Sequence, residues 1–198
     1  TRNMSSAASD VYKRQAQMWD TNFGKIVRLN DDGTVPQQNP FQSKGELAKT
    51  FWTTGHRNSL GIAFDQKNNL WANEMGPRHG DELNLIVAGA NYGWPLVSEG
   101  NHYSGALIPP HETRPDVASP VAYWVPTLAP SGLTFYIGNE FKNWEGHALL
   151  GGLKGKSLVR LKLRDQKVIE EERFSWRVRV RDVEVQKNGL IWVIEDGS

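Results

Sequence analysis

The residues best suited to chemistry lie in two short polar segments, residues 55–58 and 74–84. The first places Arg57 beside Asn58, and the second combines a Gly-Pro pair with several carboxylates. An arginine offers a planar, permanently charged fork that can bind a carboxylate at two points. Carboxylate and main-chain oxygens are ligands that a divalent cation such as Ca²⁺ accepts. The two segments therefore predict ligands for an anionic group and for a metal.

More cations follow downstream, at Lys154 and at every second position over residues 177–181. Together with the upstream segments they predict a pocket for a small, planar, multiply anionic ligand with a divalent metal beside it. On its own, the alternation of Arg177, Arg179 and Arg181 is typical of one solvated face of a strand, because period two places all three side chains together.

Short strands separated by tight turns must position these side chains. Residues 62–64 lead through a polar turn to residues 70–74, and residues 183–185 lead through a similar turn to residues 191–195. In both copies a Trp follows an aliphatic residue and a Glu lies three positions after the Trp. A looser third copy spans residues 133–150. Repeated strand pairs with long insertions between them predict the blades of a β-propeller.

The longest insertion between the copies covers residues 99–130. It is rich in proline and has no strand or helix period, so we predict a loop ordered over one face. Loops of this length in a compact domain are usually functional or disordered.

The composition limits the class of protein. The chain has 198 residues, of which 38% are hydrophobic and 23% charged, so it can bury a core. Its net charge is +1 with both signs interspersed, which predicts no nucleic-acid partner, and no apolar run is long enough for a membrane span. The absence of cysteine excludes disulfides and thiolate metal sites. Eight Trp and nineteen Gly favour an all-β protein of short strands and tight turns.

The two ends of the chain differ from the rest. Residues 1–15 have no periodic pattern and no apolar core of a signal peptide, so we predict a non-native or disordered leader. Residues 16–198 are predicted to be an incomplete domain, because the chain ends as a turn follows the last strand.

Seven short motifs follow one another along residues 16–198. They are Gly-His-Arg-Asn-Ser-Leu-Gly, Glu-Met-Gly-Pro, Asp-Glu-Leu-Asn, Gly-Ala-Asn-Tyr-Gly-Trp-Pro, Ala-Pro-Ser-Gly, Leu-Lys-Gly and Arg-Val-Arg-Asp. In this order they resemble the soluble aldose sugar dehydrogenases that depend on pyrroloquinoline quinone (PQQ), the glucose/sorbosone dehydrogenase family. The resemblance implies a six-bladed β-propeller of four-stranded antiparallel blades, of which this chain would hold about three.

The resemblance also implies an activity and a set of ligands. The family oxidises the anomeric carbon of an aldose sugar to a lactone, with PQQ as hydride acceptor, and passes the electrons to an external acceptor. The residues that match its cofactor positions are Arg57, Asn58, Tyr103, Thr127, Lys154, Arg179 and Arg181. The main-chain oxygens of Gly76 and Pro77 match those on a Ca²⁺ that acts as a Lewis acid. Glu82 and Tyr92 match a second, structural calcium site.

The catalytic base of the family is a histidine that corresponds to a position upstream of residue 16. None of the five histidines of this chain matches it, so we expect the isolated chain to be inactive. His56 lies at a family position that is not the base. The other histidines are predicted to be loop or surface residues, and they are His79, His102, His111 and His147. By the same resemblance we expect a periplasmic or secreted location.

A purely structural role for Arg57 and two other functions of a propeller stay open. Arg57 could pair with Asp81 or Glu82 in a structural turn. A calcium-dependent propeller hydrolase of the lactonase type would need several carboxylate or amide side chains around one axial ion, whereas Glu74, Asp81 and Glu82 cluster on one segment. A non-catalytic binding propeller would not need a lysine and three arginines at cofactor positions.

Overall fold

The computed structural model describes residues 13–197. These residues form β-strands and short 3-10 helices, with α-helical conformation only at residues 13 and 14, which confirms the all-β prediction. Residues 1–12 of the predicted leader lie outside the described residues, whereas Gln15 already begins the first 3-10 helix. The chain divides into two compact units. Unit 1 is Thr1–Asn58, Val87–Ser98 and Ile108–Ser119, and unit 2 is Ser59–Ile86, Glu99–Leu107 and Pro120–Ser198.

Unit 1 has little regular structure. Its elements are η1 (Gln15–Gln17), β1 (Ile26–Val27), η2 (Ala48–Thr50), β2 (Phe51–Thr53) and η3 (His111–Thr113). Strands β1 and β2 pair antiparallel, with Ile26 opposite Thr53. A small buried cluster of Ala16, Trp94 and Ile108 gives this unit its own apolar centre.

Unit 2 contains three antiparallel sheets. The first has the order β3 (Ser59–Phe64), β4 (Leu70–Glu74), β5 (Asp81–Ile86) and β6 (Ala122–Trp124). The second consists of β7 (Pro130–Phe135), β8 (Ala148–Gly152), β9 (Ser157–Arg164) and β10 (Lys167–Ser175). The third consists of β11 (Arg179–Val185) and β12 (Ile191–Asp196). The prediction of about three blades thus corresponds to two four-stranded sheets and a two-stranded one in this unit.

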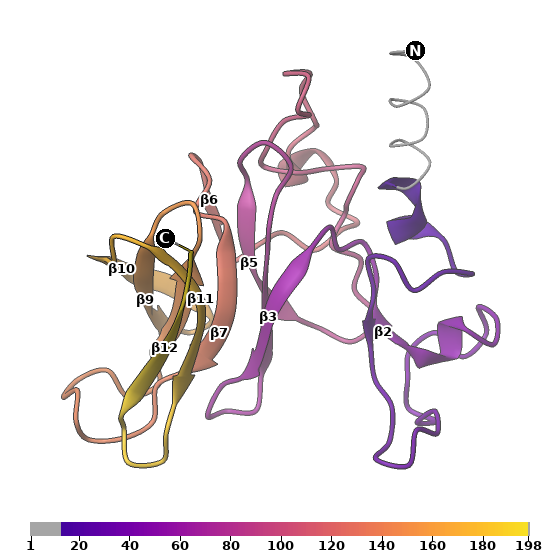
Figure 1. Cartoon of the computed structure of the whole chain (residues 1–198). Helices are drawn as coiled ribbons and strands as arrows, with labels where there is room; N and C mark the ends of the chain where they lie inside the picture. Colours follow the sequence, from indigo (N-terminus) through magenta and orange to yellow (C-terminus); the bar gives the residue numbers. More distant parts are fainter. Residues whose placement is uncertain (1–12, 198) are drawn as a thin grey trace. The chain divides into compact units, whose positions relative to one another are not determined.

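The three sheets of unit 2 pack as successive propeller blades. The first strand of each sheet lies against the first strand of the next, β3 against β7 and β7 against β11, as Figure 1 shows. Glycines permit this close approach. A Cβ on Gly61 would lie 2.6 Å from Cβ of Leu133, and one on Gly132 would lie 1.7 Å from Oδ1 of Asp182. The predicted partial propeller of antiparallel blades is confirmed.

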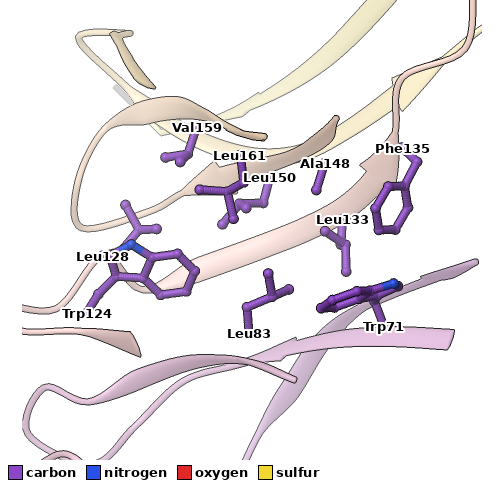
Figure 2. Close-up of a cluster of buried hydrophobic side chains, with 10 residues drawn as sticks. All are labelled: Trp71, Leu83, Trp124, Leu128, Leu133, Phe135, Ala148, Leu150, Val159 and Leu161. Atoms are coloured by element: carbon purple, nitrogen blue, oxygen red, sulfur yellow. The ribbon is translucent and has the colours of Figure 1, made fainter. Parts of the chain in front are cut away.

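Apolar side chains fill the space between the first two sheets. Trp71, Leu83 and Trp124 of the first sheet face residues of β7, β8 and β9, as seen in Figure 2. Both indoles keep a hydrogen-bond partner, since Nε1 of Trp71 donates to Asp65 and Nε1 of Trp124 donates to Glu171. Burial of these aromatic and aliphatic side chains stabilises the packing of the two sheets against each other.

The sequence repeat corresponds to one turn geometry. In the β3–β4 turn the N–H of Asp65 donates to the carbonyl of Asn69 at 2.9 Å. In the β11–β12 turn the N–H of Gln186 donates to the carbonyl of Leu190 at 2.9 Å, so the two turns match. The repeated Trp does not have one environment, however, because Trp71 is 1% exposed and Trp192 is 59% exposed.

The long insertion differs in part from the prediction. Residues 122–124 form β6, the fourth strand of the first sheet, rather than loop. Pairing of Asp81 with Trp124 and of Leu83 with Ala122 supplies the contacts that favour a strand there. No helix within residues 13–197 is long and apolar enough to cross a membrane.

Candidate functional site

In unit 1 the segment around residues 55–58 is a tight turn against residues 91–94. Gly55 has a φ of +78°, and a Cβ there would lie 2.0 Å from Oδ1 of Asn91, so only glycine fits without displacement. The N–H of Trp94 donates to the carbonyl of Gly55 at 2.9 Å. The ring of the buried His56 stacks on Tyr92 with centroids 4.5 Å apart, and its Nε2 lies 2.9 Å from Oγ1 of Thr53.

This turn presents Arg57 and Asn58. The guanidinium of Arg57 lies 5.4 Å from the ring centroid of Trp94, within the range of a cation-π interaction that orients the arginine. Asn58 is exposed. Trp94 itself is 8% exposed, so it packs into the unit.

Tyr92, an expected metal ligand, is buried in the same unit. Its carbonyl oxygen lies 3.2 Å from Nε2 of His111, which must be the donor because a carbonyl only accepts. His111 is 3% exposed, and its prediction as a loop or surface residue is therefore wrong with respect to burial.

In unit 2 Asp81 joins two loops. It is 1% exposed, and its Oδ1 accepts from the N–H of Gly76 at 2.9 Å. Its Oδ2 accepts from Oγ1 of Thr127 at 2.6 Å and from the N–H groups of Leu128 and Ala129, each at 2.7 Å. A buried carboxylate with this many donors fixes the two loops relative to each other. The sequence indicated Asp81 as an ion-pair partner or as one of a cluster of carboxylates, but not as the anchor of two loops.

The loop that carries Gly76 and Pro77 is compact. A Cβ on Gly76 would lie 2.1 Å from the carbonyl oxygen of His79, and His79 has a φ of +77°. Nδ1 of His79 accepts from the N–H of Thr127 at 3.1 Å. Within residues 13–197 no group donates a hydrogen bond to the carbonyl oxygens of Gly76 or Pro77. These oxygens therefore fit the expected role as metal ligands.

The loop at residues 127–129 and the start of β7 contact the segments that carry the cationic residues. The N–H groups of Lys154 and Gly155 both donate to the carbonyl of Leu128 at 3.1 Å. Oγ of Ser131 donates to the carbonyl of Val180 at 2.7 Å, which ties β7 to β11. Lys154 is exposed, and in the described part of the chain its Nζ has no hydrogen-bond or ion-pair partner.

Asp196 orients the two expected arginines of β11. Nη2 of Arg179 lies 3.2 Å from Oδ1 of Asp196, and Nη2 of Arg181 donates to its Oδ2. The hydrogen bond from Arg181 is the largest of the effects that hold the pKa of Asp196 below its usual value. Asp196 was not predicted. The signal available in the sequence was the β11–β12 hairpin, which pairs Arg179 with Asp196.

Arg177 departs from the predicted alternation. It precedes β11 and has a φ of +64°, so it does not continue the strand. A bulge between Val180 and Asp182 further breaks the period of two. The three arginines therefore do not form one regular face.

Tyr103 lies at the tip of a short loop beside the Gly76 segment. Arg78 and Asn101 exchange two backbone hydrogen bonds of 2.9 and 3.2 Å, and the N–H of His102 donates to the carbonyl of Ala106. Tyr103 is 74% exposed, so its ring is presented outward from this loop.

Glu82 belongs to a buried oxygen-rich group with Glu74 and Asn84. Nδ2 of Asn84 donates to Glu74 at 3.0 Å and to Glu82 at 3.2 Å. Burial, followed by the charge of Glu74, raises the pKa of Glu82 well above its usual value. Oδ1 of Asn84 is buried and has no hydrogen-bond partner in the described part of the chain. A hard cation would accept such oxygens, although residues 13–197 contain no cluster of three or more acidic or histidine side chains able to hold a metal.

The structure thus brings several predicted residues to one end of three adjacent sheets. The first sheet contributes the Gly76 loop, the second contributes Thr127 and Lys154, and the third contributes Arg179 and Arg181. Thr127 uses its hydroxyl proton on Asp81 and so has a structural role whether or not it contacts a ligand. Arg57, Asn58 and Tyr92 lie in unit 1.

A family model named glucose/sorbosone dehydrogenase matches residues 4–198. The chain belongs to the glucose/sorbosone dehydrogenase family. It is 38% identical over 190 residues to the aldose sugar dehydrogenase YliI of Escherichia coli, covering 92% of this chain and 51% of that protein. The crystal structure of the soluble aldose sugar dehydrogenase from E. coli in the apo form matches with a TM-score of 0.87 and 37% identity, over 93% of this chain and 55% of that one.

A PQQ-bound relative is also similar. The aldose sugar dehydrogenase from Streptomyces coelicolor in its PQQ-bound form matches with a TM-score of 0.72 and 30% identity, over 92% of this chain and 49% of that one. The chain spans about half the length of the curated relatives it matches, 46% of one and 51% of another.

Proposed function

We propose that this protein is a quinoprotein that oxidises the anomeric carbon of aldose sugars to lactones, with PQQ as hydride acceptor and Ca²⁺ as Lewis acid. The family and the PQQ-bound relative support the class of reaction. The observation that carries the proposal is the meeting of Gly76, Lys154 and Arg181 at one end of three successive sheets. This arrangement lets groups that are distant in sequence contact one small ligand.

The cations would hold the cofactor by its carboxylates. When bound, PQQ supplies the chemistry of accepting the hydrogen and the electron pair that leave the anomeric carbon. Arg179 and Arg181 would offer the guanidinium donors that Asp196 does not use, and Lys154 would offer a compact charge. Arg57, whose guanidinium is oriented on Trp94, would donate further hydrogen bonds to a cofactor carboxylate. The remaining polar contacts in this proposal come from Asn58, Tyr103 and Thr127.

The carbonyl oxygens of Gly76 and Pro77 would bind the catalytic Ca²⁺, since both are without hydrogen bonds from the described residues. Glu82 and the carbonyl of Tyr92 would serve a second calcium. A cation beside Glu82 would favour its ionised form and so offset the effect of burial on its pKa.

We further propose that the general base lies outside residues 13–197. Several described histidines are engaged in the fold: His56 with Thr53, His79 with Thr127, His111 with Tyr92 and His147 with Arg160. The aldose, the external electron acceptor and a periplasmic or secreted location belong to the same proposal, and they rest on the family resemblance.

The first test is Ca²⁺-dependent PQQ binding, followed by the quenching of Trp fluorescence in the purified protein. We expect Lys154→Ala to weaken binding about tenfold, because a charged hydrogen bond is worth about 1.5–3 kcal/mol and this one would be partly exposed. Lys156→Ala is the matched control, since Lys156 is an exposed lysine in the same turn, and it should change the affinity by less than about twofold. Equal loss in both variants would contradict the assignment of Lys154.

A second test measures turnover. We expect the 198-residue chain, supplied with PQQ, Ca²⁺, glucose and a dye acceptor, to show no measurable dye reduction. Without general base catalysis the reaction loses a contribution of about 10²–10⁴-fold. Robust dye reduction that disappears in His56→Ala would show that the base lies within this chain, while leaving the binding proposal intact.

A further inference from the structure

A cavity lies at the end of the sheets of unit 2 that is opposite the candidate site. It has a volume of about 680 Å³ and is bounded by the β3–β4 and β9–β10 turns and by the connection from β7 to β8. Successive connections of antiparallel strands alternate between the two ends of a sheet, so these turns lie opposite the β4–β5 and β8–β9 connections of the candidate site. Trp71 and Phe135 lie together at one end of the core cluster in Figure 2, with ring centroids 6.2 Å apart, and both line the cavity. The volume is that of a small-molecule site.

Two of the acidic side chains of this cavity are already engaged. Oδ1 of Asp65 accepts from the N–H groups of Lys67 and Asn69 at 2.9 and 2.8 Å. Its Oδ2 accepts from Nδ2 of Asn69 at 2.8 Å and from Nε1 of Trp71 at 3.1 Å. Burial opposes the ionisation of Asp65, but these hydrogen bonds outweigh it and hold its pKa below the usual value. Glu145 accepts from Gln66 and from the N–H of Gly138.

The buried His147 offers a donor instead. It is 6% exposed, and its Nδ1 lies 2.7 Å from Nη1 of Arg160. A guanidinium can only donate, so Nδ1 is the acceptor and the neutral ring carries its proton on Nε2. Within the described residues no group pairs with Nε2 of His147. Burial and the charge of Arg160 also lower the pKa of His147, which favours this neutral form.

Cations complete the wall. Lys67 and Arg164 have no side-chain partner within residues 13–197, and Nζ of Lys162 lies 3.8 Å from Oε2 of Glu170, a weak contact. The third acidic residue of the wall, Asp165, lies at the exposed tip of the β9–β10 turn. The cationic donors of this cavity are therefore unpaired or weakly paired within the described residues, whereas two of its three carboxylates are occupied by neighbouring donors.

We propose that this cavity binds a small, oxygen-rich organic anion of monosaccharide size. Its carboxylate or phosphate would lie between Lys162 and Arg164 and within reach of the imidazole N–H of His147. Its hydroxyl groups would meet the amides of Gln66 and Gln166. A sugar acid and a sugar phosphate share this chemistry. The site is separate from the proposed cofactor site and does not require it.

The test is isothermal titration of the purified protein without PQQ or Ca²⁺, at fixed ionic strength. The probes are gluconate, glucose 6-phosphate, inorganic phosphate and glucose. We expect at least one of the two anionic sugars to bind at least about tenfold more tightly than glucose and inorganic phosphate, and the stronger of the two identifies the anionic group. Equal affinity for glucose and for both anionic sugars would overturn the proposal.

Variants locate the site. Lys162→Ala and Arg164→Ala should each weaken binding of the preferred anion about tenfold. Lys187→Ala is the matched control, an exposed lysine in the β11–β12 turn that does not line the cavity, and it should leave binding unchanged. Lys154→Ala should also leave it unchanged, which separates this site from the proposed cofactor site. Binding that survives both cavity variants would overturn the assignment.

Discussion

Replacement of Asp81 by alanine is expected to lower the free energy of unfolding by on the order of 4 kcal/mol. The carboxylate is 1% exposed and accepts from the N–H groups of Gly76, Leu128 and Ala129 and from the hydroxyl of Thr127. Each donor left without a partner in a buried site costs about 1–3 kcal/mol, less whatever water can restore. Urea unfolding followed by circular dichroism measures the change.

Two further variants make the expectation specific. Asp81→Asn keeps the shape and one oxygen acceptor, so it should lose about half as much stability. Asp116→Ala removes an exposed carboxylate paired with Arg114 and should leave the free energy of unfolding nearly unchanged. If Asp81→Ala were no worse than Asp116→Ala, the two loops would be held by something other than this carboxylate. Asp81→Asn should also weaken PQQ binding, because Gly76 and the Thr127 segment lose a common anchor.

The general architecture could be predicted from sequence because it depends on local signals. Strand pairs ending in a five-residue polar turn gave the repeat, and the turns at Asp65 and Gln186 indeed share one hydrogen-bond pattern. The strand at residues 122–124 could not be predicted in this way. Its three residues have no period of their own and become a strand because β5 offers a free edge with matching partners.

In the candidate site, too, the features set by local sequence could be predicted and those set by distant contacts could not. Residue types and motif order indicated Lys154, Arg179 and Arg181, but not the residues that hold them. Asp81 and Asp196 act through contacts with residues distant in sequence or on a paired strand, and no local pattern reports such contacts. The prediction that Arg177 shares a strand face with Arg179 and Arg181 was also wrong. Its backbone φ of +64° interrupts the extended conformation that an alternation of period two requires.

Arg181→Ala is expected to weaken PQQ binding by about ten- to a hundredfold, equivalent to about 1.5–3 kcal/mol. Arg181 donates to Oδ2 of Asp196 through Nη2, which leaves its other guanidinium donors for a ligand carboxylate. Arg179→Ala should have an effect of similar size, because its Nε and Nη2 face Asp196 and its Nη1 stays available. Fluorescence titration with PQQ in the presence of Ca²⁺ measures both.

The shared carboxylate makes the two arginine variants interdependent. Removing one arginine leaves Asp196 with the other, whose remaining donors it can then draw away from the ligand, so the double variant should lose less binding free energy than the sum of the single ones. Arg177→Ala is the matched control, because this exposed arginine precedes β11 and does not contact Asp196. It should change the affinity by less than about twofold. Full additivity, or an equal loss in Arg177→Ala, would show that general positive charge rather than oriented guanidinium groups holds the cofactor.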